Sequence, residues 1–80
     1  MSRTAGLENR LKIQRVTHGD LSQAQVADLV GCSRQTIHSI EAGKFVPSVE
    51  LALKIAAALK IRVEDLFQLV AEVDKLDKEG

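Results

Sequence analysis

The stretch of sequence that decides the fold is QAQVADLVGCSRQTIHSIEAGK, residues 23–44. Small and aliphatic residues recur in it at helical spacing among polar side chains. Ser22 precedes the stretch and Gln25 follows three positions later, which is the capping-box pattern of a helix start. Gly31 suits the left-handed turn that ends a helix, and Ser33 suits the start of the next one. The stretch therefore predicts two short helices joined by a tight turn.

The two predicted helices are expected to cross at a fixed angle. Ala27 lies where the first helix must approach the second, and Gly31 lies four residues later in the turn. A larger side chain at either position is expected to push the helices apart. Ile37 and Ile40 complete the seam from the second helix. These four residues are therefore predicted to be structural, and the side chains left outside on the second helix are Arg34, Gln35, His38 and Ser39.

The outer face of the second helix carries side chains that suit the base edges of DNA. Arginine can bond guanine O6 and N7, and glutamine can bond adenine N6 and N7, from the first turns of a helix that lies in the major groove. A polar residue such as Gln35 in a first helical turn is often only exposed surface. His38 is compatible with either a DNA contact or simple exposure, so the choice depends on the rest of the chain.

The remaining segments indicate three further helices. The first is expected from Leu7 to about Thr17, the next follows Pro47 and Ser48, and the last begins near Glu64 with two acids in its first turn. No stretch alternates polar and apolar residues with period two, so the expected fold class is all-α. The residues expected to face the core are Leu7, Leu11 and either Ile13 or Val16 in the first of these helices, Val26, Leu29 and Val30 in the helix before Gly31, and Val49, Ala52, Leu53, Ala56 and Leu59 in the helix after Ser48.

Several short motifs occur in a fixed order along the chain. They are LSQ at 21–23, SRQTI at 33–37, IEAGK at 40–44, LALKIA at 51–56 and EDLF at 64–67. In this order and spacing, residues 9–67 resemble the helix-turn-helix repressors of the Cro and lambda-repressor type, also called the xenobiotic-response-element family. The chain is most similar to the small single-domain members. The resemblance implies a five-helix lambda-repressor-like domain whose second and third helices form the helix-turn-helix.

The resemblance also implies which residues contact DNA. Contacts to base edges are expected from Arg34, Gln35 and Ser39, with His38 beside them. Contacts to the sugar-phosphate backbone are expected from Gln23, Ser33, Thr36 and Lys44. Base readout and backbone contact are therefore assigned to different side chains.

The resemblance implies a structural role for Glu41. It matches the family's partner of an arginine at the end of the first helix, here Arg15, and this reading is preferred over a catalytic acid because a partly buried charge normally has a mate. The sequence departs from the family at two places. The turn at 17–21 is one residue longer than usual, and Arg62 stands where relatives often have a serine or threonine cap.

The net charge is zero, but the charges are distributed unevenly. Residues 1–62 carry nine Lys and Arg against five Asp and Glu, a net +4, whereas residues 63–80 carry two against six, a net −4. A basic body can meet the phosphates of DNA if the acidic end points elsewhere. The charge distribution is therefore compatible with a nucleic-acid partner.

The C-terminal segment is expected to bind a second copy of the chain. Residues 1–6 are predicted to be flexible, residues 7–67 to form the DNA-binding domain, and residues 68–80 to form an acidic helical extension of the last helix. The apolar stripe of this extension either folds back on its own domain or faces a second copy. A homodimer is preferred, because one recognition helix reads only a few base pairs. The predicted dimerisation residues are Leu66, Leu69, Val70, Val73 and Leu76.

Several other classes of protein are disfavoured. The apolar runs are too short for a membrane span and residues 1–6 lack a signal-peptide core, so a cytoplasmic location without membrane association is expected. The single Cys32 is interpreted as a small buried hydrophobe in preference to a redox sensor. His18, His38 and Cys32 lack the spacing of metal ligands. Without a nucleophile beside a base or a phosphate-cradling glycine loop, neither an enzyme nor a cofactor is expected.

These observations predict a homodimeric, sequence-specific transcriptional regulator. It is expected to bind a palindromic operator in double-stranded DNA, with half-site centres about 34 Å apart, and to act as a repressor. Single-strand binding is disfavoured, because the only aromatic residues, Phe45 and Phe67, both fit the core or its edge. The alternative is an antitoxin or another protein-interaction module that binds a protein partner through the apolar stripe from Leu66 to Leu76.

Overall fold

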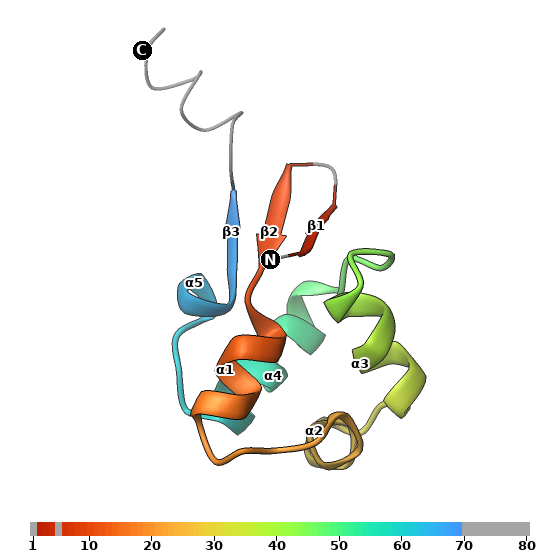
Figure 1. The fold of residues 1–80 in the computed structure, drawn as a ribbon, viewed down its shortest axis with the longest axis vertical. Helices are drawn as coiled ribbons and strands as arrows, with labels where there is room; N and C mark the ends of the chain where they lie inside the picture. The colour runs from red at the N-terminus through yellow and green to blue at the C-terminus, as the bar shows by residue number, and fades with distance from the viewer. Residues whose placement is uncertain (1, 5, 70–80) are drawn as a thin grey trace, which may run out of the picture.

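Five helices and three short strands make up the fold in the computed structural model, which describes residues 2–4 and 6–69 (Figure 1). Their order is β1 (Ser2–Thr4), β2 (Leu7–Asn9), α1 (Leu11–Thr17), α2 (Gln23–Val30), α3 (Arg34–Glu41), α4 (Val49–Leu59), α5 (Val63–Leu66) and β3 (Phe67–Leu69). α2 packs against both α3 and α4, and α1 contacts α3. The expected number and order of helices are confirmed.

Serine side chains set the starts of three helices. Ser22, Ser33 and Ser48 each accept a hydrogen bond from the backbone N–H three residues on, at 3.0, 3.1 and 3.1 Å. Gln25 Oε1 accepts in turn from the N–H of Ser22 at 2.8 Å, which completes the predicted capping box. A cap of this kind contributes about 1 kcal/mol to stability. The sequence signals at the starts of α2, α3 and α4 are therefore confirmed.

Gly31 ends α2 in the left-handed backbone conformation, with a φ of 78°. A Cβ atom at this position would meet no atom within 4 Å beyond its chain neighbours. The expectation that a larger side chain at Gly31 would push α2 and α3 apart is therefore wrong. The turn needs glycine for its positive φ, which costs other residues roughly 1 kcal/mol or more.

One hydrophobic core joins the five helices. Ala27, Ile37 and Ile40 are buried in it, as the sequence predicts for the seam between α2 and α3. The full set of buried apolar residues is Leu11, Val26, Ala27, Val30, Ile37, Ile40, Ile55, Ala56, Leu59 and Leu66. Every helix therefore contributes at least one fully or nearly fully buried side chain, which fixes the position of α3 against the rest.

Several aliphatic residues expected in the core are exposed instead. They are Ile13 and Val16 in α1, Leu29 in α2, and Val49 and Leu53 in α4. The buried stripe of α4 runs through Ile55, Ala56 and Leu59, and Ile55 is not one of the expected core residues. Because α4 is aliphatic over most of its surface, the apolar pattern alone does not decide which stripe is buried. Packing against α2 and α5 decides it.

The three strands form a sheet that the sequence does not predict. The sheet is antiparallel in the order β1-β2-β3, with Leu7 opposite Leu69, and Figure 1 shows the strands side by side at one end of the helical part. Consequently α1 begins at Leu11 and not at Leu7. Residues 2–4, expected to be flexible, form β1. Strands of three residues are too short to show a period-two pattern.

Asn9 fixes the junction between β2 and α1. Its Oδ1 accepts a hydrogen bond from the N–H of Leu11 at 3.3 Å, and its Nδ2 donates to the carbonyl of Ile40 at 3.0 Å. Asn9 is buried, where a polar group needs such partners to offset its lost hydration. The side chain thereby ties β2 to the end of α3, and α1 starts only after it.

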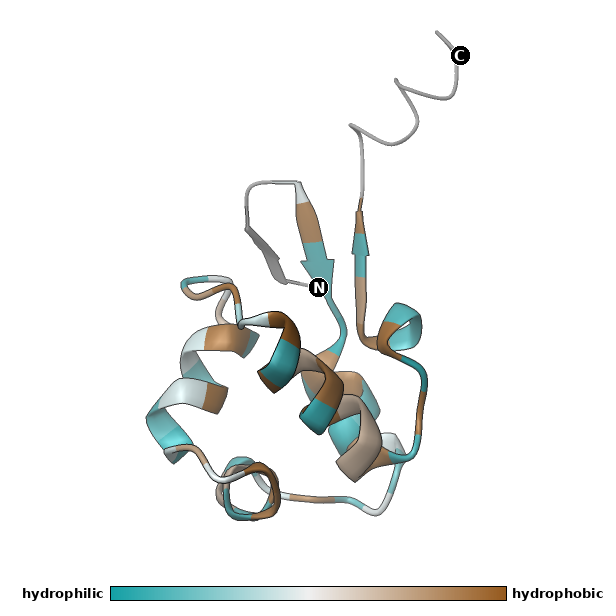
Figure 2. Ribbon diagram, turned by 180° about the vertical axis from the view of Figure 1, so that it is seen from behind, coloured by the Kyte–Doolittle hydropathy of each residue, from teal (hydrophilic) through white to brown (hydrophobic). Residues whose placement is uncertain are grey.

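The end of the described chain corrects the predicted helical extension. α5 ends at Leu66, and Gln68 and Leu69 belong to β3, where apolar and polar residues alternate (Figure 2). Leu66 is completely buried in the core, which contradicts its predicted contact with a second chain, whereas Leu69 is exposed. The other predicted dimerisation residues lie outside the described residues. They are Val70, Val73 and Leu76.

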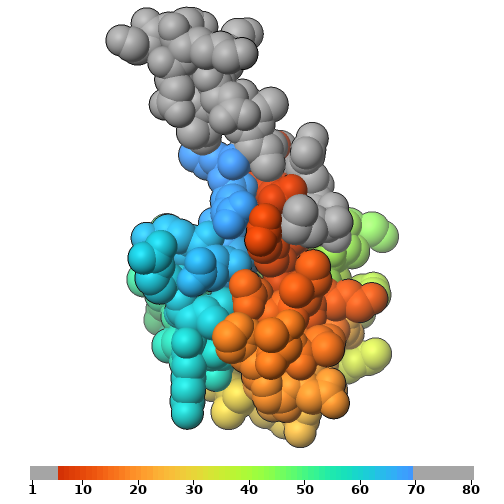
Figure 3. Space-filling model, turned by 60° about the vertical axis from the view of Figure 1, so that its left-hand side comes forward, coloured from red at the N-terminus to blue at the C-terminus, as the bar shows by residue number. Residues whose placement is uncertain are grey.

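Two hydrogen bonds connect Arg10, the residue before α1, and Gln14 of α1 to the end of α5. The N–H of Arg10 donates to the carbonyl of Leu66 at 2.9 Å, and Gln14 Nε2 donates to the carbonyl of Asp65 at 3.1 Å. Figure 3 shows α1 beside α5, and β2 beside β3. Arg62 occupies the N-cap position of α5 and provides no side-chain cap. Both bonds engage carbonyls at the end of α5, and α5 also packs against α4, so tertiary contacts hold this short helix although its N-cap residue provides no side-chain hydrogen bond.

Candidate nucleic-acid interface

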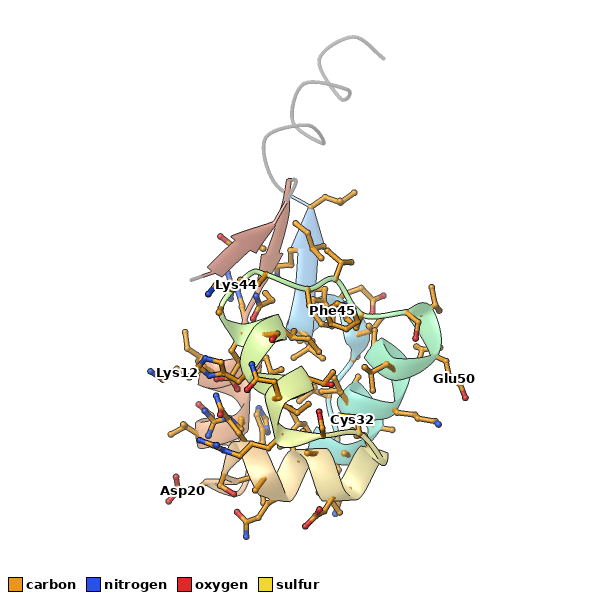
Figure 4. The ribbon with its side chains drawn as sticks, turned by 90° about the vertical axis from the view of Figure 1, so that its right-hand side faces the viewer. Lys12, Asp20, Cys32, Lys44, Phe45 and Glu50 are labelled. Atoms are coloured by element: carbon orange, nitrogen blue, oxygen red, sulfur yellow. The ribbon has the colours of Figure 1, made fainter. Side chains whose placement is uncertain are left out.

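The outer face of α3 carries the four side chains predicted to contact bases. Ile37 and Ile40 are buried on one side of the helix, while Arg34, Gln35 and His38 are exposed and Ser39 is half-buried on the other side. These four are neighbours at spacings of one and four residues, so they share one surface. In Figure 4, α3 lies in front of the core with α2 below it. We call these four residues the α3 outer face.

Two hydrogen bonds organise the polar side chains along α3. Gln35 Nε2 donates to Ser39 Oγ at 3.4 Å, one helical turn further on. The hydroxyls of Ser33 and Thr36 share a hydrogen bond at 2.9 Å, while Ser33 also caps the helix. Ser33 therefore has a capping role that the predicted backbone contact does not account for. These bonds restrict the rotamers of residues that would face DNA, which lowers the entropy lost on binding.

Gln23, predicted to contact a phosphate, is linked to α3. Its Nε2 donates to Glu41 Oε1 at 3.0 Å and lies 3.5 Å from His38 Nδ1. Gln23 is the first residue of α2, where backbone N–H groups and the helix dipole favour an anion. The first turn of α2 and the outer face of α3 are thereby joined into one polar surface.

An ion pair between Arg15 and Glu41 supports this surface from within. Arg15 Nε lies 2.8 Å from Glu41 Oε2 and Nη2 lies 3.1 Å from Oε1, so the contact is bidentate. Arg15 Nη1 also donates to the carbonyl of Leu21 at 2.7 Å. The two side chains are only 12% and 8% exposed. The predicted pair is present, and it connects α1, the turn before α2, and α3. Removing one partner of such a pair typically costs about 3–5 kcal/mol.

A hollow opens beside the α3 outer face. Its volume is about 310 Å³, and it is lined by Gln35, Thr36, Ser39, Lys44 and Phe45. Figure 4 shows Lys44 and Phe45 on the loop that follows α3. Phe45 is 46% exposed. The family resemblance implies a contact between Lys44 and the DNA backbone. It implies no DNA contact for Phe45, the next residue in the chain.

The charges around this surface favour an anion. Arg34, Lys44 and Lys12 are exposed, and the charge of Glu41 is compensated by Arg15. Figure 4 shows Lys12 and Lys44 on one side of the view, with Asp20 also on that side, and Glu50 on the opposite side. Glu50 forms an exposed ion pair with Lys54 at 3.2 Å. The exposed cations on this side, Lys12, Arg34 and Lys44, outnumber the exposed Asp20, which suits a phosphate backbone.

Cys32 precedes Ser33 in the turn between α2 and α3. It is half-buried and packs against the core, and burial raises the pKa of its thiol. A raised pKa leaves less of the reactive thiolate at neutral pH. Within the residues that the structure describes, no group of three His, Cys, Asp or Glu side chains lies close enough to hold a metal ion. None of the described helices is both long and apolar enough to cross a membrane.

A second surface feature, the apolar groove, is lined by no residue of α2 or α3. Its volume is about 280 Å³, and its lining comes from β2, the loop before α4, α4, α5 and β3. All the lining residues are apolar, and two of them, Val49 and Leu53, are exposed although they are expected in the core from the sequence. The lining residues are Leu7, Val46, Pro47, Val49, Ala52, Leu53, Val63 and Phe67.

The helix-turn-helix family model matches residues 11–66, from the start of α1 to the end of α5. The chain belongs to this family. It is 46% identical over 61 residues to an uncharacterised HTH-type transcriptional regulator of Methanocaldococcus jannaschii, covering 76% of this chain and 91% of the relative. It is 42% identical over 66 residues to the uncharacterised HTH-type transcriptional regulator YgzD of Bacillus subtilis, covering 82% of this chain and 98% of the relative.

Solved structures show the same fold. The restriction-modification controller protein C.AhdI from Aeromonas hydrophila superposes with a TM-score of 0.65 at 36% identity, covering 70% of this chain and 83% of that one. The lambda-repressor-like architecture and the Cro-type resemblance are therefore confirmed. The protein is a DNA-binding helix-turn-helix transcriptional regulator, and its family is not an enzyme class.

Proposed function

We propose that this helix-turn-helix regulator reads a specific operator in double-stranded DNA with α3 and represses transcription by occupying it. One observation carries the proposal: Arg34, Gln35 and Ser39 share an exposed face of a helix whose other face is buried in the core. In the major groove, Arg34 bonds a guanine and Gln35 bonds an adenine, while Ser39 holds the Gln35 amide. His38 completes the base-contacting set.

The residues around this face contact the sugar-phosphate backbone. The Gln23 amide is held by Glu41 at the N-terminus of α2, which favours a phosphate. Lys44 adds a charge after α3, and the paired hydroxyls of Ser33 and Thr36 stand at the start of α3. These contacts place α3 in the groove, and the α3 outer face reads base edges there.

The regulator binds its operator as a homodimer through the apolar groove. Contiguous apolar patches larger than a few hundred Å² are rare on soluble monomers, and a groove lined only by apolar side chains suits an interface. Val49, Leu53 and Leu69 are all more than half exposed at or beside the groove. A second copy is the occupant that fits this protein's activity, because a twofold dimer doubles the number of base pairs read. No residue of α2 or α3 lines the groove, so both copies of α3 stay available to DNA in such a dimer.

Selection of bound duplexes from a random pool tests the proposed function. The parent is expected to enrich a palindrome with half-site centres about 34 Å apart. The variant carrying Arg34→Ala and Gln35→Ala is expected to lose this preference while keeping salt-sensitive, nonspecific binding. If the parent enriches no sequence at moderate salt, the proposal is wrong. A reporter with the enriched sequence in its promoter then tests repression, and increased expression would show activation instead.

The apolar groove also favours a second candidate function, a protein-interaction module such as an antitoxin. In that case the groove binds a different protein. This candidate predicts that Arg34→Ala and Gln35→Ala leave the cellular effect intact, whereas Leu53→Asp abolishes it without changing self-association. If the protein is a homodimeric regulator, Arg34→Ala and Gln35→Ala are instead expected to abolish the cellular effect.

A further inference from the structure

We propose that the hollow beside α3 receives the C5-methyl group of a thymine in the operator, and that Phe45 makes the regulator specific for that methyl group. This inference rests on the proposed function, since it concerns a base next to those read by α3. It adds to the polar contacts of α3 a contact made by the loop that follows the helix. Phe45 thereby becomes a specificity-determining residue.

The lining of the hollow combines polar and apolar surface. Gln35, Thr36 and Ser39 supply an amide and two hydroxyls from successive turns of α3, and Lys44 supplies a cation. Phe45 is the aromatic member of this set, and almost half of its surface is exposed. An aromatic ring at a surface that meets DNA gains free energy when an apolar group of the DNA covers it.

The chemistry of the major groove identifies that group. Each base pair presents hydrogen-bond donors and acceptors there, and the thymine C5-methyl is the apolar feature, which phenylalanine is suited to contact. Gln35 lines the same hollow and is suited to bond an adenine. Because adenine pairs with thymine, an A·T pair read by Gln35 brings a methyl group to the same region of the groove.

Two features of the structure keep Phe45 near the bases. Lys44, its neighbour in the chain, lines the hollow and is placed to contact a phosphate, which draws the loop to the DNA. The N–H of Lys44 donates to the carbonyl of Ser39 at 2.9 Å, so the loop is tied to the last turns of α3. The hollow therefore moves with α3 into the groove.

Replacing thymine by deoxyuridine tests the inference, because it removes the methyl group and nothing else. Each thymine of the selected operator is replaced in turn, and the Kd is measured for the parent and for Phe45→Ala. For the parent, one position in each half-site is expected to weaken binding by roughly three- to tenfold, the size of one buried methyl group. At that position Phe45→Ala is expected to bind thymine and uracil duplexes with nearly equal affinity.

The control variants separate a methyl contact from other roles. Lys44→Ala is expected to weaken binding to the thymine and uracil duplexes equally. Phe45→Leu, which keeps an apolar side chain, is expected to retain part of the difference in Kd between these two duplexes. The inference is overturned if no uracil substitution weakens the parent, or if Phe45→Ala weakens both duplexes by the same factor, as packing against deoxyribose would. In those cases the parent still selects an operator. If it selects none, the proposed function fails and the inference fails with it.

Discussion

The hollow beside α3 and the apolar groove beside α4 differ in chemistry although they are similar in volume, about 310 and 280 Å³. The hollow is lined by an amide, two hydroxyls, an ammonium group and one aromatic ring. The groove is lined by aliphatic side chains, a proline and one phenylalanine. A polar, cationic surface suits DNA, whereas an apolar surface suits another protein. The comparison teaches that one small domain presents two surfaces of different chemistry, which is the basis for proposing a different partner for each.

Breaking the ion pair beneath the α3 outer face should have the largest effect. Glu41→Ala leaves Arg15 buried without its partner, so the free energy of unfolding should fall by about 3–5 kcal/mol. Urea denaturation of the parent and the variant measures this change. The matched control is Glu50→Ala, because the Glu50–Lys54 pair is exposed and should contribute less than about 1 kcal/mol. An equal decrease in the free energy of unfolding for Glu41→Ala and Glu50→Ala would contradict a structural role for Glu41.

A charge in the apolar groove should separate the two copies of the protein. Leu53→Asp places a carboxylate at a proposed interface, and the dimer Kd should rise tenfold or more, as desolvation of an unpaired charge is costly. Sedimentation equilibrium measures this Kd. Leu29→Asp is the matched control, because Leu29 is 62% exposed, against 52% for Leu53, and lies outside the groove. If both variants dissociate the dimer, or if neither does, the apolar groove is not the dimer interface.

Removing the Gln35 amide should relax sequence preference at one position. A bidentate contact contributes about 1–3 kcal/mol of discrimination against the wrong base. Gln35→Ala should therefore lose that discrimination at one position of each half-site and keep it elsewhere. Competition between the selected operator and its single-base variants measures the change. A uniform loss of affinity over all duplexes would instead place Gln35 against the backbone.

Removing the charge of Lys44 should have the smallest effect. Lys44→Ala should weaken binding to all duplexes by a similar factor and reduce the slope of log K against log salt by about 1 for each monomer bound. Titrations at several salt concentrations measure the slope. If Lys44→Ala changes the base preference and leaves the slope unchanged, Lys44 contacts a base and not a phosphate.

Signals close together in the sequence predict the part of the fold that carries the α3 outer face. Ser22, Ser33 and Ser48 act through hydrogen bonds within three residues, and Gly31 acts through its own backbone angle. Ile37 and Ile40 lie on the buried side of a helix of only two turns, where the apolar spacing allows one choice. For such features the sequence determines the local structure almost without help from the rest of the chain.

The features that sequence reasoning missed depend on contacts between distant residues. β2 pairs with the nearby β1 and also with Phe67–Leu69, some sixty residues away. The distant pairing takes the place of the predicted helix at Gln68 and Leu69. The exposed stripe of α4 follows from its packing against α2 and α5. The apolar groove is formed by both effects together, so neither its lining nor the exposure of Leu53 could be predicted from periodicity.

The most direct test of two separate surfaces is the affinity of Leu53→Asp for a single half-site and for the complete palindrome. The account predicts that this variant binds the half-site as tightly as the parent does, because the α3 outer face is intact, and that it loses the extra affinity which the parent shows for the palindrome. If Leu53→Asp weakens half-site binding as strongly as palindrome binding, the apolar groove and the DNA-binding surface are not independent and the account is contradicted.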